Sequence, residues 1–350
     1  MLVETKYDVY FIHNMYYEQL SELPIKYILD SNIVADFERF YYRPEKMSKE
    51  QKIKLSELIS FFRAKSVDYS YALTELSSNY KDGGIIDDYY RSANKAVSML
   101  LKMSPSKLRG HTRFGKNKER NLTFQSQTEF GPPSKIIKLT LPLLGQAYTP
   151  LAKLFYELKL NSSNKIKVFS NFLHFMDEEL CALSLYEVGF ATYLLFTNQD
   201  ELKYVQSLLK VNNKIEISKK IWNASWDITF LRYINSIAGR VMSEEDVGSR
   251  RANWILVTRD KALGELSNLL KSDTEQSHCG KIASNLIIDT QQIKSQYLAQ
   301  YMNIYDDIMS EESLNRRISF LSICDPIAYN DSIIRKADNL INQLCSLNSE

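Results

Sequence analysis

Four acidic residues, far apart in the sequence, have the surroundings expected of metal-binding carboxylates. Asp30 and Asp260 each follow a short apolar run of the kind that forms a buried strand, and Glu75 and Asp227 lie in stretches with helical spacing. Parallel strands of an α/β sheet end at one edge, where carboxylates from strand ends and adjoining helices can surround a divalent cation. The four residues therefore indicate a metal-dependent hydrolase and, within that class, a nuclease.

Each acid also has an ordinary structural alternative. Asp30 and Asp260 could be helix N-caps, where Asp is a favoured residue. Glu75 could lie on a solvated helix face, and Asp227 could form a hydrogen bond near a helix start. Asp227 nevertheless shares an apolar stripe with Leu231, Ile234 and Ala238. We therefore expect it to be buried, which is costly for a carboxylate unless it is paired or bound to a metal.

The rest of the sequence predicts the elements that would carry these acids. Apolar patterns predict strands at 7–12, 24–30, 253–258 and, more weakly, 285–289. Helical spacing predicts helices that begin near Asn32 and that cover 48–62, 66–79, 135–210 and 290–350. Gly and Pro residues within 104–134 predict a long loop or hairpin.

The composition narrows the class of protein. The hydrophobic fraction of 44% and the charged fraction of 25% are typical of a soluble globular chain, and 11 Gly with 8 Pro are too few for an all-β sandwich. Four Cys and four His are scattered without a C-x-x-C pair, which disfavours a structural zinc site and predicts reduced cysteines in a cytoplasmic protein. We expect neither a signal peptide nor a membrane span.

Taken in order, the acidic motifs resemble those of the PIN-domain nucleases. The motifs are YILDSNIV with Asp30, YALTELSSN with Glu75, WDITFL with Asp227, and ILVTRDKAL with Asp260. Two spacings depart from a minimal PIN domain. Residues 76–226 separate the second acid from the third, which implies an insertion. The interval between Asp227 and Asp260 is also long, so that Glu245 or Asp246 could supply the third acid instead.

The resemblance implies an α/β fold with a PIN-like parallel sheet flanked by helices. The core would comprise 1–84 and 213–289, divided by a mostly helical insertion at 85–212 and followed by a helical region at 290–350. Mg²⁺ or Mn²⁺ would be held directly by Asp30 and Asp260, and directly or through water by Glu75 and Asp227. Thr258 and Asn32 would position these carboxylates.

A basic segment provides a candidate surface for nucleic acid. It contains Phe114, His111 and six cations: Lys107, Arg109, Arg113, Lys116, Lys118 and Arg120. Cations interleaved with an aromatic ring are typical of phosphate-backbone contact combined with base stacking. The alternative is a solvated loop, which is the usual fate of a run of charge.

The sequence thus predicts an endoribonuclease, with RNA favoured over DNA because the resemblance implies it, and with a possible toxin or defence role. A DNA nuclease or another metal-dependent phosphoesterase is the alternative enzyme. A catalytically inactive PIN-like binding module is the alternative from another class, and a helical adaptor, in which the acids are only caps, is a third. The helical regions could also bind a protein partner or a second copy of the chain.

Overall fold

The strands predicted before Asp30 and Asp260 both form, and they are direct neighbours. β3 (Ile25–Leu29) runs parallel to β5 (Asn253–Thr258), with Leu29 opposite Val257. The backbone N–H of Asp30 donates to the carbonyl oxygen of Val257 at 2.9 Å, so the pairing continues one residue past β3. Two acids that are distant in the sequence therefore follow the carboxyl ends of adjacent strands.

The sheet is mixed, so the expectation of a parallel sheet is correct only in part. β4 (Ser66–Asp68) adds to β3 in parallel, but β2 (Tyr10–His13) is antiparallel to β5 and β1 (Leu2–Glu4) is antiparallel to β2. The strand order is β1-β2-β5-β3-β4. Only residues 5–9 lie between β1 and β2, too few for the crossover that parallel neighbours need, so these two strands must be antiparallel. The α/β class itself is confirmed.

The computed structural model describes residues 2–4, 7–78, 86–116, 118, 133–197, 214–242, 248, 251–273 and 285–347. They fall into two compact units. Unit 1 takes the described parts of Met1–Thr140 and Phe230–Ser267, and unit 2 takes those of Leu141–Thr229, Asn268–Thr274 and Asn285–Glu350. The limit between Thr140 and Leu141 lies inside the predicted insertion at 85–212, so that residues 86–116 belong to the same unit as the sheet.

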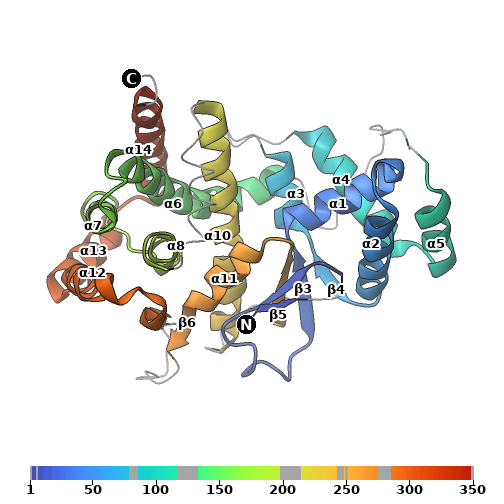
Figure 1. Ribbon diagram of the computed structural model, residues 1–350, viewed down its shortest axis with the longest axis horizontal. Coiled ribbons are helices and arrows are strands. Elements are labelled where there is room, and N and C mark those ends of the chain that lie inside the picture. Colours follow the sequence, from blue (N-terminus) through green and yellow to red (C-terminus); the bar gives the residue numbers. More distant parts are fainter. Residues whose placement is uncertain are drawn as a thin grey trace. The chain divides into compact units, whose positions relative to one another are not determined.

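Helices surround the sheet of unit 1, as Figure 1 shows. They are α1 (Ser31–Tyr42), α2 (Lys49–Phe62), α3 (Ser70–Ser77), α4 (Asp87–Lys102), α5 (Pro105–Phe114), the later half of α10 (Lys214–Met242) and most of α11 (Lys261–Leu269). α1 packs against both α3 and α4. Every residue of β5 is buried, as are Phe37 and Phe40 on the inner face of α1.

Three predicted segments of unit 1 need correction. The strand predicted at 7–12 begins only at Tyr10, because Asp8 has a left-handed φ of +57° that interrupts an extended chain. The helix predicted over 66–79 is β4 followed by α3, since the Asp68 carboxylate accepts from the backbone N–H of Ser70 and starts the helix there. The loop predicted at 104–134 contains α5.

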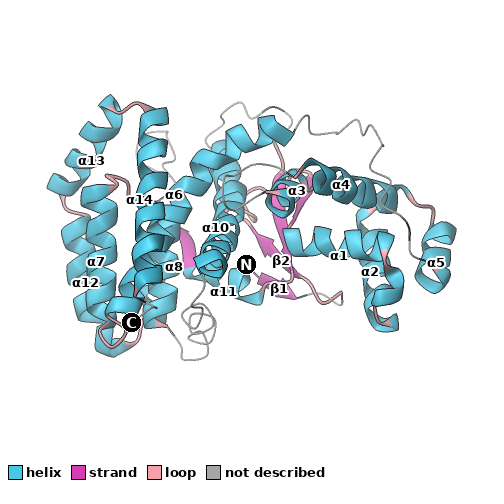
Figure 2. Cartoon of the chain, turned by 90° about the horizontal axis from the view of Figure 1, so that it is seen from above, coloured by secondary structure: helices cyan, strands magenta, loops and turns pink. Residues whose placement is uncertain are grey.

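Unit 2 is built mainly of helices, as predicted for 135–210 and 290–350 where these segments are described. They are most of α6 (Pro133–Leu160), α7 (Lys165–His174), a π-helical turn (Phe175–Glu179), α8 (Leu185–Phe196), the first part of α10, α12 (Ser295–Ile308), α13 (Glu311–Ile323) and α14 (Pro326–Ser346). α7 packs against α8 and α12 (Figure 2). The strand expected near 285–289 is β7 (Asn285–Ile288), which pairs with an unpredicted strand, β6 (Leu270–Asp273).

A buried carboxylate anchors the helices of unit 2. Asp177, 1% exposed, forms ion pairs with Arg316 and Arg317 of α13 and accepts a hydrogen bond from the Ser313 hydroxyl at 3.2 Å. Arg317 also donates to the carbonyl oxygen of Ile308 at 3.0 Å. Because a buried charge is costly without partners, this cluster fixes how α13 lies on the π-helical turn.

No helix in the described part of the chain is long and apolar enough to cross a membrane.

Candidate active site

Asp30 is buried at the junction of β3 and α1, with only 1% of its surface exposed. One carboxylate oxygen, Oδ1, accepts the backbone N–H of Ser31 at 2.6 Å. The other, Oδ2, accepts from the Asn32 amide and from the Thr258 hydroxyl, each at 2.5 Å. Asp30 therefore is the N-cap of α1, as the structural alternative had it, and it is also tied to the end of β5.

The Thr258 hydroxyl connects the two strand ends. It donates to Asp30 Oδ2, accepts from Asn32 Nδ2 at 3.0 Å, and accepts the backbone N–H of Asp260 at 2.9 Å. A hydroxyl has one proton to donate and two lone pairs, so all of its hydrogen-bonding capacity is used. Thr258 and Asn32 are thus placed where the sequence reasoning had put them, beside the carboxylate of Asp30.

Burial, with a smaller contribution from the negative charge of Asp260, raises the pKa of Asp30 to about 6. The hydrogen bonds from Thr258 and Ser31 oppose this increase because they stabilise the charged form. Asp260 is half-buried, and its carboxylate accepts the backbone N–H of Leu263 at 3.3 Å near the start of α11. Two carboxylates that repel each other at a strand edge form a site at which a cation is favoured.

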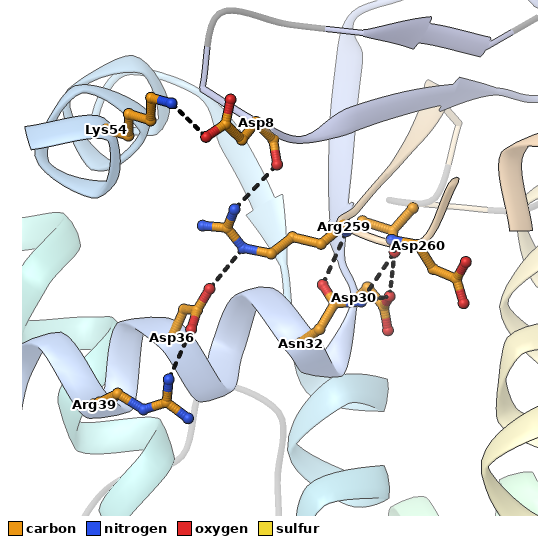
Figure 3. Close-up of polar contacts among 9 residues, drawn as sticks. Asp8, Asp30, Asn32, Asp36, Arg39, Lys54, Arg259 and Asp260 are labelled. Carbon is orange, nitrogen blue, oxygen red and sulfur yellow. Dashed lines mark hydrogen bonds and ion pairs between the residues drawn. The ribbon is translucent and has the colours of Figure 1, made fainter. Parts of the chain in front are cut away.

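Arg259 holds the chain between Thr258 and Asp260 in place, as Figure 3 shows. Its backbone N–H donates to Asn32 Oδ1 at 3.1 Å, and its side chain donates to Asp36 at 2.6 Å and to the carbonyl oxygen of Asp8 at 3.0 Å. The Asp8 carboxylate is itself paired with Lys54 of α2 at 2.5 Å. This network, which the sequence reasoning missed, links β5 to α1 and α2.

Among the described residues, neither of the other two predicted acids forms a metal-holding group with this pair. Glu75 is half-buried in α3, in the same unit. Asp227 is half-buried in the part of α10 that belongs to unit 2, although Leu231, Ile234 and Ala238 of its stripe are buried as predicted. The expectation that Asp227 itself is buried is therefore wrong, in keeping with the cost of burying a carboxylate. Glu245 and Asp246 lie outside the described residues.

Within the described ranges, no group of three or more His, Cys, Asp or Glu side chains is arranged to hold a metal ion. The donor set is thus the pair Asp30 and Asp260. Mg²⁺ is commonly held by one or two carboxylates, with water and substrate phosphate completing its coordination. The pair fits a cation of this kind, but it does not form a cage made of protein ligands alone.

One further strand-end acid was missed by the sequence reasoning. Asp68 ends β4, and its backbone lies opposite Ile28 of β3. Its carboxylate accepts from both the backbone N–H and the hydroxyl of Ser70, and its charge contributes to raising the pKa of buried Tyr90. The signal that could have revealed it is the apolar Val67 directly before an Asp, a short counterpart of the longer apolar runs that end at or shortly before Asp30 and Asp260.

The predicted basic segment lies on α5 and just beyond it. Five of its six cations are described and exposed: Lys107, Arg109, Arg113, Lys116 and Lys118; Arg120 lies outside the described residues. Phe114 is 78% exposed at the end of the helix. The buried face of α5 consists of Leu108 and His111, with His111 Nε2 2.8 Å from the carbonyl oxygen of Phe40.

No protein-family model, no curated protein and no solved structure matches this chain.

Proposed function

We propose that unit 1 is a PIN-like, metal-dependent nuclease domain that hydrolyses RNA phosphodiester bonds. The observation that carries the proposal is the pairing of Asp30 and Asp260 at the carboxyl ends of adjacent parallel strands, close enough for one charge to raise the pKa of the other. Ligand sites in α/β sheets are found at this edge. The resemblance of the motifs supports the same reading.

Asp30 and Asp260 would hold Mg²⁺ or Mn²⁺, which, when bound, supplies a water of lowered pKa and neutralises charge on the phosphate. The protein's own contribution is to fix these two carboxylates. Thr258 and Asn32 hold Asp30 by hydrogen bonds of 2.5 Å, and the Asp260 backbone is bound to Thr258. Groups held in this way need no rearrangement on binding, which favours reaction.

Glu75 of the same unit is the next candidate ligand, directly or through water. The role of Asp227 stays a prediction from the sequence, as do the toxin or defence role and the cytoplasmic location.

The test is cleavage of total RNA and of single-stranded DNA in the presence of Mg²⁺ or Mn²⁺. We expect cleavage by the wild type, loss of at least two orders of magnitude in the double variant Asp30→Asn/Asp260→Asn, and no change in Asp307→Asn. Asp307 is an exposed acid of α12 and controls for the loss of charge. Cleavage that persists in the double variant would exclude the site.

A catalytically inactive binding module is the second candidate, and one observation favours it. Both oxygens of Asp30 already accept hydrogen bonds, and the Asp260 carboxylate accepts a backbone N–H near the start of α11. The two carboxylates therefore stabilise the fold even without a metal. RNA binding by the folded wild type without any metal-dependent cleavage of RNA or DNA would support this candidate.

A further inference from the structure

Lysines from three separate segments gather around α5 in unit 1. Burial lowers the pKa of His111, and the charges of Lys118 and of Lys52 on α2 lower it further. Burial also lowers the pKa of Lys118, with a contribution from Lys95 on α4. The helices themselves are in contact, since α2 packs against both α4 and α5. The sequence reasoning had not connected Lys52 or Lys95 with the basic segment.

Within the described ranges, carboxylates do not neutralise Lys52, Lys118 or the cations of α5. α5 contains neither Asp nor Glu. Among the described residues, no carboxylate pairs with Lys52, with Lys118 or with the cations of α5, whereas Lys54 on the same helix α2 is paired with both Asp8 and Glu50. The neighbouring helices do carry acids: Glu57 is exposed on α2, and Asp87 and Asp88 begin α4. The excess of positive charge is therefore confined to α5 and to the residues that face it.

One aromatic ring within this surface is open to solvent. Phe114 is 78% exposed and stands between Arg113 and Lys116. Tyr41, by contrast, is buried, and the Lys118 ammonium lies 4.0 Å from the centre of its ring. The backbone N–H of Lys118 also donates to the carbonyl oxygen of Tyr42 at 2.9 Å. The charge of Lys118 is therefore held in a fixed position, and Phe114 offers a free face for a base.

We propose that Lys52 and Lys118, together with the exposed cations of α5 and the ring of Phe114, form a binding surface for single-stranded nucleic acid. The lysines contact phosphates, and one base stacks on Phe114. A double helix keeps its bases stacked within the duplex and cannot use this ring without being opened. The choice of nucleic acid as the ligand rests on the proposed function, whereas the location of the surface rests on the geometry around α5.

Helix α1 fixes the separation between this surface and the Asp30–Asp260 pair. Asp30 caps the start of α1 and Tyr41, beneath Lys118, lies near its end. Eleven residues at about 1.5 Å each give roughly 16 Å along the helix axis. At about 3.4 Å per nucleotide, about five nucleotides are needed to cover this distance, and fewer are needed in an extended strand. A strand bound at both places must therefore exceed this length.

The test measures binding in EDTA, so that cleavage plays no part. The probe is a fluorescent 12-nucleotide single-stranded RNA, followed by anisotropy over a range of salt concentrations, with the duplex of the same sequence for comparison. Two variants of the full chain are examined, Lys52→Gln/Lys107→Gln and Phe114→Ala. The matched control, Lys167→Gln/Arg335→Gln, removes the same charge from exposed positions of unit 2.

We expect the lysine variant to weaken binding and to reduce the slope of log K against log salt by about 1.4, because each phosphate contact with a single strand contributes about 0.7. Phe114→Ala should weaken binding to the single strand roughly 5- to 150-fold and leave binding to the duplex unchanged. Equal weakening by the control, an unchanged salt slope, or a duplex that depends equally on Phe114 would overturn the proposal. The variant Asp30→Asn/Asp260→Asn should lose cleavage but still bind the RNA. This result would show that the binding surface around α5 and the Asp30–Asp260 pair act separately, so that either proposal can fail without the other.

Discussion

The raised pKa of Asp30 predicts an unusual dependence of stability on pH. The carboxyl group has a pKa of about 6 in the folded protein against 3.8 for an aspartate in water, so the folded state binds more protons than the unfolded state between these limits. The free energy of unfolding must then fall as pH rises through this window. A pKa difference of about 2, at about 1.36 kcal/mol for each pH unit, amounts to roughly 3 kcal/mol of stabilisation. This stabilisation is lost as the pH rises from about 4 through about 6.

Two measurements check this reasoning. Carboxyl carbon resonances, followed by NMR from pH 3.5 to 8, should show one aspartate with a midpoint near 6, absent from Asp30→Asn. Urea unfolding should show that the free energy of the wild type, minus that of Asp30→Asn, decreases by roughly 3 kcal/mol over the same range. The amide of the variant also faces the Asn32 amide and the Thr258 hydroxyl. The free-energy cost of these unfavourable contacts does not depend on pH, so it does not alter how the free-energy difference changes with pH.

Asp260→Asn provides the internal control for the second cause of the shift. Removal of the Asp260 charge should lower the titration midpoint of Asp30. The decrease should be small, because burial of Asp30 is the larger cause of its raised pKa. A midpoint for Asp30 near 4, or a free-energy difference that does not change with pH, would refute the reasoning. So would a midpoint that rises in Asp260→Asn.

Three further outcomes follow from the structure. Thr258→Val removes a hydrogen bond that favours the charged form, so NMR should find the pKa of Asp30 above 6, with a loss of about 1–3 kcal/mol in urea unfolding; a lower pKa would contradict this. Asp177→Asn leaves a buried guanidinium without its partner and should cost about 3–5 kcal/mol; an unchanged melting temperature would contradict it. In Gly115→Ala the new Cβ would lie 2.4 Å from the carbonyl oxygen four residues earlier, so RNA binding should weaken, whereas Gly110→Ala, with open space around it, should bind normally.

The sequence predicted the β3–α1 and β5–α11 junctions correctly because each has a clear local signal. β5 is a continuous buried run, which is the pattern of a strand covered on both faces, and Asp30 is a favoured residue for starting a helix. The proximity of Asp30 to Asp260 followed from a rule about parallel strands rather than from either motif.

The errors came from segments whose local signal is weak or is overridden by tertiary contacts. α5 has only Leu108 and His111 on its buried face and a Gly at position 110, so apolar periodicity is nearly absent. It is held by the Ser104 cap and by the hydrogen-bonding contact of His111 with a carbonyl of α1. β4 is three residues long, too short for any period to be recognised, and the contacts of Arg259 join residues far apart in the chain.

The hydrogen bonds around Thr258 have a polarity that the main chain dictates. Because the backbone N–H of Arg259 can only donate, the side-chain atom of Asn32 that it meets must be the oxygen, and the amide nitrogen is left to face Thr258 and Asp30. The backbone N–H of Asp260 likewise makes the Thr258 oxygen an acceptor, so that its single proton goes to Asp30. The side-chain donors of Asn32 and Thr258 thus both converge on the carboxylate of Asp30. Asn32→Asp would reverse this sense at a single position, replacing a donor with a third negative charge.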